Sequence, residues 1–470
     1  MHDTKLQRTQ SSGHRRPGRQ WLGGDSLIWL LGVTVLFVAA ELLPALLHMP
    51  LGADEITYIA RTSAHASGVD LPPVHGHGAG LLAAPVTLLT TSLVALRVWM
   101  ALLSGAGLFL GMLSWRGLRP AWVLALAGLV LGSMAITQLS GVQVYPDWWA
   151  AVGILALTGL FLQAVNGRWR SGPLLTLIGF CTFLIVMMRP QNIFFVLLPV
   201  LAVAIFVPTW RKPKIIAAMA AGIVFGLADW VGESYLWYGG LAGRIHLAGQ
   251  EPPKFMLYFS FPYQVKVLSG PWYCEPGACH AWNYPWETVW WAVLAGLGVL
   301  GLVVAWRKST TFRYSSLLAA GTAIWVAGCY FLLVPFGAPR YLLPTYALLA
   351  ILAADAIAWL VTQARWRTAG AAFACVFLLA GIVTQHMVLT RQISQQTAVR
   401  TFAEEASKLR KLGVHPPCVI HSPSVGYFLG CEAPWTGEST LELLKRTQFG
   451  VDGWVRMRLP DRTVVYVPRK

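Results

Sequence analysis

Charged residues are scarce in this sequence of 470 residues: only 12% are Asp, Glu, Lys or Arg, whereas 56% are hydrophobic. Soluble domains typically carry about 25% charged residues, so this scarcity excludes an ordinary soluble protein. Acidic residues are especially few, with 20 against 36 basic ones, and the net charge is +16. The basic residues fall in short patches between apolar runs. This distribution argues against nucleic-acid binding and indicates a polytopic membrane protein.

Apolar runs able to cross a bilayer recur along the chain. We predict eleven membrane spans, over residues 27–47, 94–113, 121–140, 148–165, 173–188, 192–209, 215–235, 287–306, 315–336, 343–363 and 369–389. Basic clusters, such as the one containing Arg116 and Arg119, fall in every second connection. Because positive residues favour the cytoplasmic side, we predict a cytoplasmic N-terminus and an extracytoplasmic C-terminus.

These spans divide the chain into three parts. Residues 1–25 are polar and basic and are predicted to be a disordered cytoplasmic tail. Residues 26–389 form an all-α transmembrane domain whose two long outer loops span 49–92 and 236–286. Residues 390–470 alternate helical and strand patterns, which predicts a small α/β domain outside the membrane.

Cysteine is also sparse, with seven residues in the chain. Three cysteines lie within predicted spans, whereas Cys274, Cys279, Cys418 and Cys431 lie in regions assigned to the outside. Cys274 and Cys279 enclose a Pro-Gly turn, and Cys418 and Cys431 flank a short helical pattern. Disulfides form outside the cytoplasm, so we predict one bridge in each pair; four free thiols are the alternative.

Ionisable residues near the spans lie mainly at their outer ends. Asp54 and Glu55 follow the first span, Asp147 occupies a short outer loop, and Arg189 and Arg340 stand at the outer ends of later spans. A transporter would instead place such groups near the bilayer midplane. This distribution predicts a site at the outer interface, where a lipid-linked substrate can meet a water-soluble or wall-bound one.

Four short motifs occur in order, each on the predicted outer side. They are the Asp-Glu pair in Gly52–Tyr58, then Tyr145-Pro146-Asp147, Met188-Arg189-Pro190 and Pro339-Arg340-Tyr341-Leu342-Leu343-Pro344. Together they resemble the polytopic GT-C glycosyltransferases, especially the branch of protein mannosyltransferases and aminoarabinose transferases (glycosyltransferase family 39). The likeness covers roughly residues 25–365.

The resemblance implies an inverting hexosyl- or pentosyltransferase of the plasma membrane. Its donor would be a polyprenyl-phosphate sugar, and its acceptor a protein, glycan or lipid on the extracytoplasmic side. Such transfer needs a carboxylate base, for which Asp54 is the first choice, and positive charge for the departing phosphate. The catalytic candidates are Asp54, Glu55 and Asp147. The candidates for binding the donor phosphate are Arg340, Arg189, Tyr341 and Tyr58.

The sequence departs from the family in one respect, and one alternative function competes with glycosyl transfer. Neither long outer loop contains an Asp-x-Asp motif, so a divalent metal is not supported as a cofactor, although His75 and His77 are weak candidate ligands. The alternative function is a transporter or flippase for a lipid-linked envelope precursor. That function predicts charges along a transmembrane path and a pair of broken helices.

Overall fold

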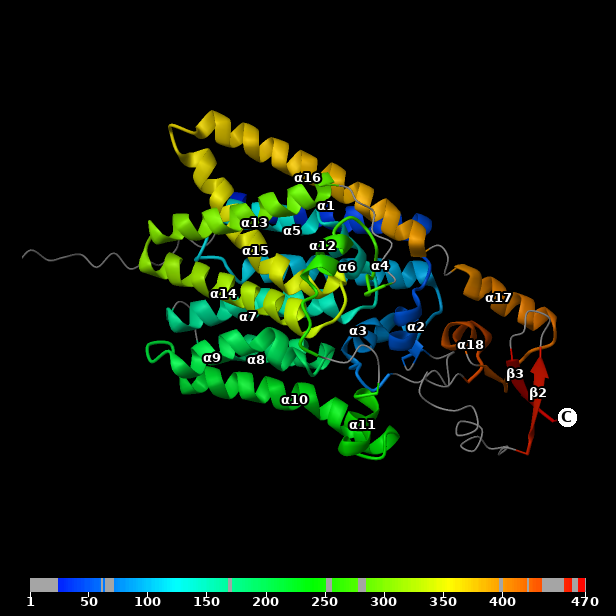
Figure 1. Cartoon of the computed structure of the whole chain (residues 1–470). Helices are drawn as coiled ribbons and strands as arrows, with labels where there is room; N and C mark the ends of the chain where they lie inside the picture. Colours follow the sequence, from blue (N-terminus) through cyan, green and yellow to red (C-terminus); the bar gives the residue numbers. More distant parts are fainter. Residues whose placement is uncertain are drawn as a thin grey trace, which may run out of the picture.

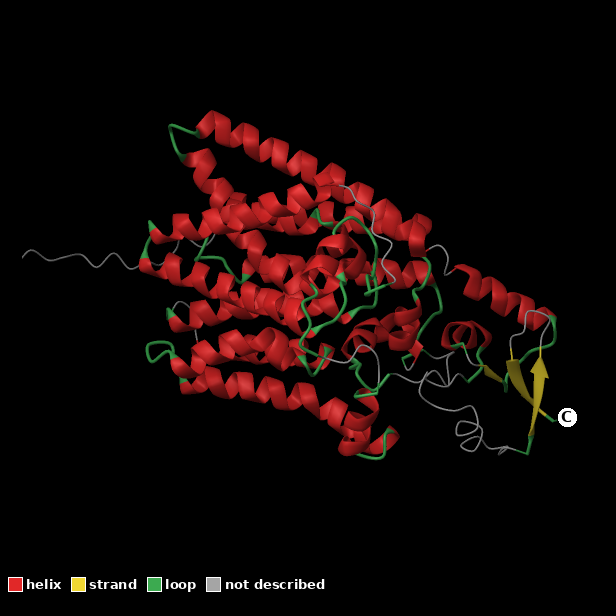
Figure 2. Ribbon diagram, viewed as in Figure 1, coloured by secondary structure: helices red, strands yellow, loops and turns green. Residues whose placement is uncertain are grey.

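The computed structural model describes residues 24–60, 62–63, 72–167, 171–250, 256–277, 285–396, 400–420, 422–432, 452–458 and 464–469. Within these residues the protein is a bundle of long helices, and the strands are confined to a small C-terminal sheet (Figure 2). Residues 1–23 of the predicted cytoplasmic tail lie outside the described residues.

Eight helices of the described chain are long and apolar enough to cross a membrane. They are α1 (Gly24–His48), α4 (Leu93–Leu113), α7 (Pro146–Val165), α10 (Pro213–Trp237), α13 (Pro285–Trp306), α14 (Thr310–Leu333), α15 (Leu343–Thr362) and α16 (Arg367–Gln396). The shorter apolar helices are α3 (Gly78–Thr87), α8 (Ser171–Met188) and the π-helical turn η1 (Ile193–Leu197) with α9 (Leu198–Phe206). Each predicted span coincides with helix, but the number of spans stays a prediction.

The segment 121–140 differs from the single straight span that its hydropathy predicts. It forms α5 (Ala121–Gly132) and α6 (Ala135–Val142), which are bent by 82° relative to each other. Side chains satisfy the backbone groups that the break exposes: Gln138 donates to the carbonyl of Gly132, and Gln385 on α16 accepts from the N–H of Ala135. Backbone groups within a bilayer need such internal partners, so the break is supported by tertiary contacts.

The core of the bundle lies where its helices approach one another closely. Helix α7 lies in the middle of the bundle and is buried along most of its length (Figure 1). Helices α8 and α10 pack tightly where Gly222 and Gly226 face Gly179, Thr182 and Val186, because a Cβ atom at either glycine would clash. Small residues allow this backbone approach in membrane bundles, where close packing replaces the hydrophobic driving force.

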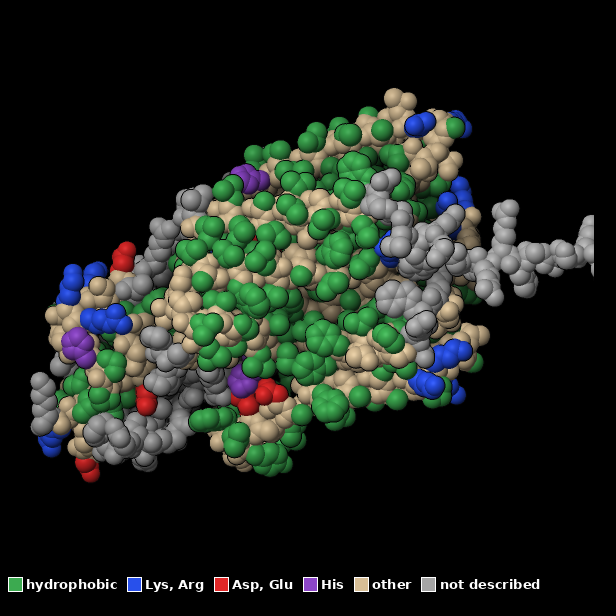
Figure 3. All heavy atoms as spheres, turned by 180° about the vertical axis from the view of Figure 1, so that it is seen from behind, with side chains coloured by type: hydrophobic (Ala, Val, Ile, Leu, Met, Phe, Trp, Pro, Cys, Tyr) green, Lys and Arg blue, Asp and Glu red, His purple; other side chains and the backbone are tan. Residues whose placement is uncertain are grey.

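Charged side chains lie mainly at the two ends of the bundle, and hydrophobic side chains cover its middle (Figure 3). One basic residue between α4 and α5 is not on the surface. Arg119 is buried and donates two hydrogen bonds of 2.8 and 2.9 Å to Asp355, and others to Ser315 and Ser316. Asp355 therefore belongs to a structural ion pair.

The C-terminal segment forms a separate small unit at one end of the bundle (Figure 1). It contains α17 (Arg400–Lys411), α18 (Pro423–Leu429) and an antiparallel sheet of order β1-β3-β2, from β1 (Val419–Ile420), β2 (Trp454–Arg458) and β3 (Val464–Pro468). A disulfide joins Cys418 and Cys431, on either side of α18. Cys274 is also disulfide-bonded, and Cys279 lies outside the described residues.

Helix α18 packs against α2 (Ala53–Ala60), the short helix that carries the Asp-Glu pair. Ala60 of α2 joins the apolar core of the C-terminal unit, together with Val425 and Leu429 of α18. The remaining short helices are α11 (Leu241–Ala248), α12 (Phe261–Val267) and the 3-10 turn η2 (Pro339–Leu342). The C-terminal unit thus adjoins the segment in which the sequence places its first catalytic candidates.

Candidate active site

Helix α2 presents its two acidic residues to different surroundings. Glu55 is buried, and its oxygens accept hydrogen bonds from Arg97 (2.8 Å) and from the N–H groups of Gly52 and Val144 (2.9 Å each). Its bond to Gly52 caps the N-terminus of α2, since Glu55 occupies the third helical position. Glu55 thus fixes α2 against the bundle, and its role as a catalytic candidate stays a prediction.

Asp54, the preceding residue, faces out of the bundle. Its side chain is 51% exposed, and its Oδ2 lies 3.5 Å from Nη2 of Arg340. Arg340 reaches this position because Pro339 begins η2 and Pro344 lies in the first turn of α15, which places the arginine at the start of the helix. The carboxylate is therefore accessible and lies beside a buried positive charge.

Asp147 lies between two arginines. It is buried in the first turn of α7, where the helix dipole favours a negative charge. Its Oδ1 lies 3.3 Å from Nη1 of Arg189, and its Oδ2 lies 3.7 Å from Nε of Arg340. Arg189 directly follows α8 and precedes Pro190, a position at which helices end. The sequence predicts these three residues as site candidates, and the fold brings them together with Asp54.

Aromatic rings surround the two guanidinium groups. The ring of Tyr341 lies 5.0 Å from the guanidinium carbon of Arg189 and 5.2 Å from that of Arg340. Trp272 and Tyr145 lie 5.2 and 5.4 Å from Arg340. Such cation–π contacts help to hold the two arginines in place.

Two tyrosine hydroxyls belong to the same site. Burial raises the pKa of Tyr58 and that of Tyr145, and nearby carboxylates raise both further. Both hydroxyls therefore stay protonated at neutral pH and can donate hydrogen bonds. Tyr58 is a candidate from the sequence. Tyr145 belongs to the motif Tyr145-Pro146-Asp147 but is not among the predicted site residues, and no local signal separates Trp272 from the other aromatic residues of its outer loop.

Several nitrogen atoms here are buried and have no hydrogen-bond partner among the described residues. They are Nε of Arg189, Nε and Nη1 of Arg340, and Nδ1 of His75. Buried polar groups in folded proteins are nearly always paired, and guanidinium groups pair best with carboxylates or phosphates. This arrangement has the chemistry of an anion-binding site.

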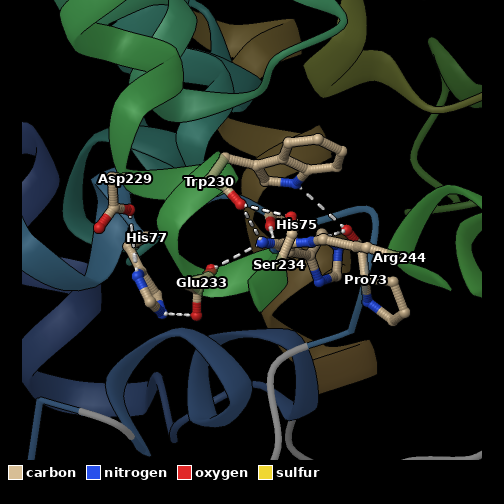
Figure 4. Close-up of polar contacts among 8 residues, drawn as sticks. All are labelled: Pro73, His75, His77, Asp229, Trp230, Glu233, Ser234 and Arg244. Atoms are coloured by element: carbon tan, nitrogen blue, oxygen red, sulfur yellow. Dashed lines mark hydrogen bonds and ion pairs between the residues drawn. The ribbon is translucent and has the colours of Figure 1, made fainter. Parts of the chain in front are cut away.

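A second cluster lies beside the first outer loop (Figure 4). Nδ1 of His77 lies 3.2 Å from Asp229, and its Nε2 lies 2.9 Å from Glu233. One ligand atom from each of these residues lies within 4.8 Å of the others, so the three could hold a divalent cation. Burial alone would lower the pKa of His77, but its hydrogen bonds to the two acids raise it to about 9, so a metal would have to displace a proton. His75 is not part of this cluster.

No protein-family model matches this sequence, and no curated protein matches it either. Among solved structures, ArnT from Cupriavidus metallidurans bound to undecaprenyl phosphate matches with a TM-score of 0.62 and 14% identity, covering 93% of this chain and 97% of that one. The apo state of the same protein matches with a TM-score of 0.61 and 13% identity, covering 94% and 98%. The chain therefore shares its fold with ArnT. The archaeal oligosaccharyltransferase AglB from Archaeoglobus fulgidus is less similar, with a TM-score of 0.46 and 13% identity, covering 80% and 58%.

Within this fold, the candidate site draws on segments that are far apart in the sequence. It combines α2, the first turn of α7, the residue after α8, and η2. The sequence identifies these four positions by short motifs. It does not identify the partners that hold them, such as Arg97 for Glu55, because those contacts arise only when the helices pack.

Proposed function

We propose that this protein is a membrane glycosyltransferase that moves a sugar from a polyprenyl-phosphate donor to an acceptor, with inversion at the anomeric carbon. The observation that carries the proposal is the meeting of Asp54, Asp147, Arg189 and Arg340 at one end of the bundle. The fold shared with ArnT supports it, since one of the matching structures has undecaprenyl phosphate bound.

The donor phosphate would bind to Arg340 and Arg189. Their unpaired N–H groups supply forked donors for phosphate oxygens, and Tyr341 packs against both guanidinium groups. The hydroxyl of Tyr58 is a further possible donor to the phosphate or sugar. The carboxylate of Asp147 lies between the two arginines, with one oxygen near each, and would fix the distance between their guanidinium groups.

Asp54 would act as the general base. The acceptor hydroxyl oxygen attacks the anomeric carbon from the face opposite the phosphate, and its proton passes to the carboxylate of Asp54. The bond between the anomeric carbon and the phosphate oxygen breaks, and its electron pair goes to the polyprenyl phosphate, whose charge the arginines stabilise. A positioned base of this kind typically contributes about 10²–10⁴-fold to the rate. Asp54 fits because it is the exposed carboxylate of the site.

The orientation in the membrane follows from the distribution of charge. Basic residues such as Arg211 and Arg307 lie at the end of the bundle away from the candidate site. By the positive-inside rule that end is cytoplasmic, so the site would face the extracytoplasmic side of the plasma membrane. The C-terminal unit would then lie outside the cell, where the acceptor is encountered.

Sugar transfer by the purified protein in nanodiscs tests the proposal. With a mixture of labelled polyprenyl-phosphate sugars, we expect acceptor-dependent release of polyprenyl phosphate and a labelled product of inverted configuration. A transporter or flippase would instead move the intact donor across vesicle membranes without releasing polyprenyl phosphate. That result, with no turnover of any donor, would overturn the proposal.

A further inference from the structure

His75 lies in the short loop that leads from the first outer loop into α3, close to the two arginines. Its ring packs against that of Tyr58, with the ring centres 4.9 Å apart. The loop itself lies against the end of α8, since a Cβ atom on Gly76 would be only 2.6 Å from the carbonyl oxygen of Met187. His75 is therefore held next to the helix end from which Arg189 projects.

Two clamps hold this loop, one on each side of His75 (Figure 4). On one side, the buried Arg244 donates to the carbonyl oxygens of Pro73 and His75, each 3.0 Å away. On the other side, His77 is held by Asp229 and Glu233. Glu233 also pairs with Arg244 at 3.0 Å, so both clamps are anchored at the same point of α10. These contacts fix the backbone on both sides of His75, and a substrate contact requires such support.

The imidazole of His75 has a hydrogen-bonding nitrogen to spare. Its ring has two nitrogen atoms, and either can carry the proton that makes it a donor. The Nδ1 atom is buried and has no hydrogen-bond partner among the described residues. It is thus a buried hydrogen-bonding group, held in place beside the helix end that carries Arg189.

We propose that His75 contacts the substrate directly and donates a hydrogen bond from Nδ1 to a phosphate oxygen of the lipid-linked donor, alongside Arg189 and Arg340. This proposal rests on the proposed function and names a further ligand of its phosphate. A donor held in this position adds a directed hydrogen bond, which helps to orient the phosphodiester between the two arginines.

Two isosteric variants of the full-length protein in nanodiscs test this role. His75→Asn keeps an amide near the position of Nδ1, whereas His75→Gln places its amide near the position of Nε2. The probe is a polyprenyl monophosphate, with binding measured by titration calorimetry. We expect His75→Gln to weaken binding by roughly ten-fold and His75→Asn by less than about three-fold, because a hydrogen bond to a charged group contributes about 1.5–3 kcal/mol.

Two results would overturn the role of His75. Equal loss in both variants with a lowered melting temperature would make His75 structural, and wild-type affinity in His75→Gln would remove it from the site. The variant Arg340→Gln separates the two proposals. If Arg340→Gln abolishes the binding of polyprenyl monophosphate and His75→Gln leaves that binding unchanged, the phosphate site stands and the role of His75 fails. If the wild type binds no polyprenyl phosphate, both proposals fail.

Discussion

The guanidinium group of Arg340 lies 3.5 Å from the carboxylate of Asp54, although 286 residues separate them in the chain. The same arginine lies 3.7 Å from Asp147, which in turn pairs with Arg189. Acid and base groups from four segments thus form one continuous network at the end of the bundle. A bound phosphate would compete with the carboxylates for these arginines, so donor binding and the availability of the base are coupled.

Replacing Arg340 by Lys should weaken donor binding although the charge is kept. Lysine lacks the planar fork that contacts a phosphate at two points and the flat face that stacks on Tyr341. We expect about ten-fold or greater loss of affinity for polyprenyl phosphate, measured by calorimetry in nanodiscs. The matched control is Arg307→Lys, an exposed arginine at the other end of the bundle, which should bind normally. Normal binding by Arg340→Lys would place the phosphate elsewhere.

Replacing Glu55 by Gln should destabilise the protein. The change leaves Arg97 buried without its carboxylate partner, and breaking a buried ion pair in this way typically costs about 3–5 kcal/mol. We expect a clear fall in the melting temperature of the purified protein in detergent. Asp54→Asn is the control next to it in sequence, with an exposed side chain, and should melt like the wild type. If Glu55→Gln melts normally but loses activity, Glu55 is catalytic after all.

Stability should depend on pH through His77. Its pKa in the fold, about 9, lies above the unfolded value of about 6.5, because Asp229 and Glu233 favour the charged ring more than burial disfavours it. Protonation therefore stabilises the fold fully below pH 6.5, and this stabilisation is lost as the pH rises through 9. We expect the melting temperature of the wild type to fall over this range relative to His77→Gln. Parallel curves for the two proteins would show that His77 is not charged in the fold.

Removing the disulfide between Cys418 and Cys431 should loosen the C-terminal unit. A bridge over a loop of this length typically stabilises by roughly 2–4 kcal/mol. Because α18 packs on α2, we expect faster proteolysis around residues 400–432 in Cys418→Ser/Cys431→Ser, together with reduced transfer activity. Cys375→Ser, which removes an exposed free thiol, is the control and should change neither. Unchanged proteolysis would show that the bridge is dispensable.

Much of the bundle can be predicted from the sequence because membrane helices are encoded locally. Each apolar run is long enough to form helix in its own right, and prolines such as Pro146 and Pro213 mark helix starts. The four charged positions of the site can also be predicted, since short motifs place each one at the end of a predicted span. Their convergence confirms the expectation of a single polar site at one end of the bundle.

The contacts between distant segments could not be predicted. The break between α5 and α6 has no proline, and it depends on Gln385, which lies 250 residues further along the chain. Arg119 resembles other basic loop residues until Asp355, 236 positions away, is placed beside it. Likewise, His77 meets Asp229 only because α3 packs near the end of α10. Such pairings follow from the packing of the helices, which no local pattern specifies.

The measurement that tests the central claim most directly is sugar transfer by Asp54→Asn, compared with wild type under saturating donor. The control is Asp452→Asn, an exposed carboxylate of the C-terminal unit. We expect Asp54→Asn to bind polyprenyl phosphate at least as tightly as the wild type and to melt normally, but to transfer sugar about 10²–10⁴-fold more slowly, with Asp452→Asn unchanged. Wild-type transfer by Asp54→Asn would contradict the assignment of Asp54 as the base and the reading of this site as catalytic.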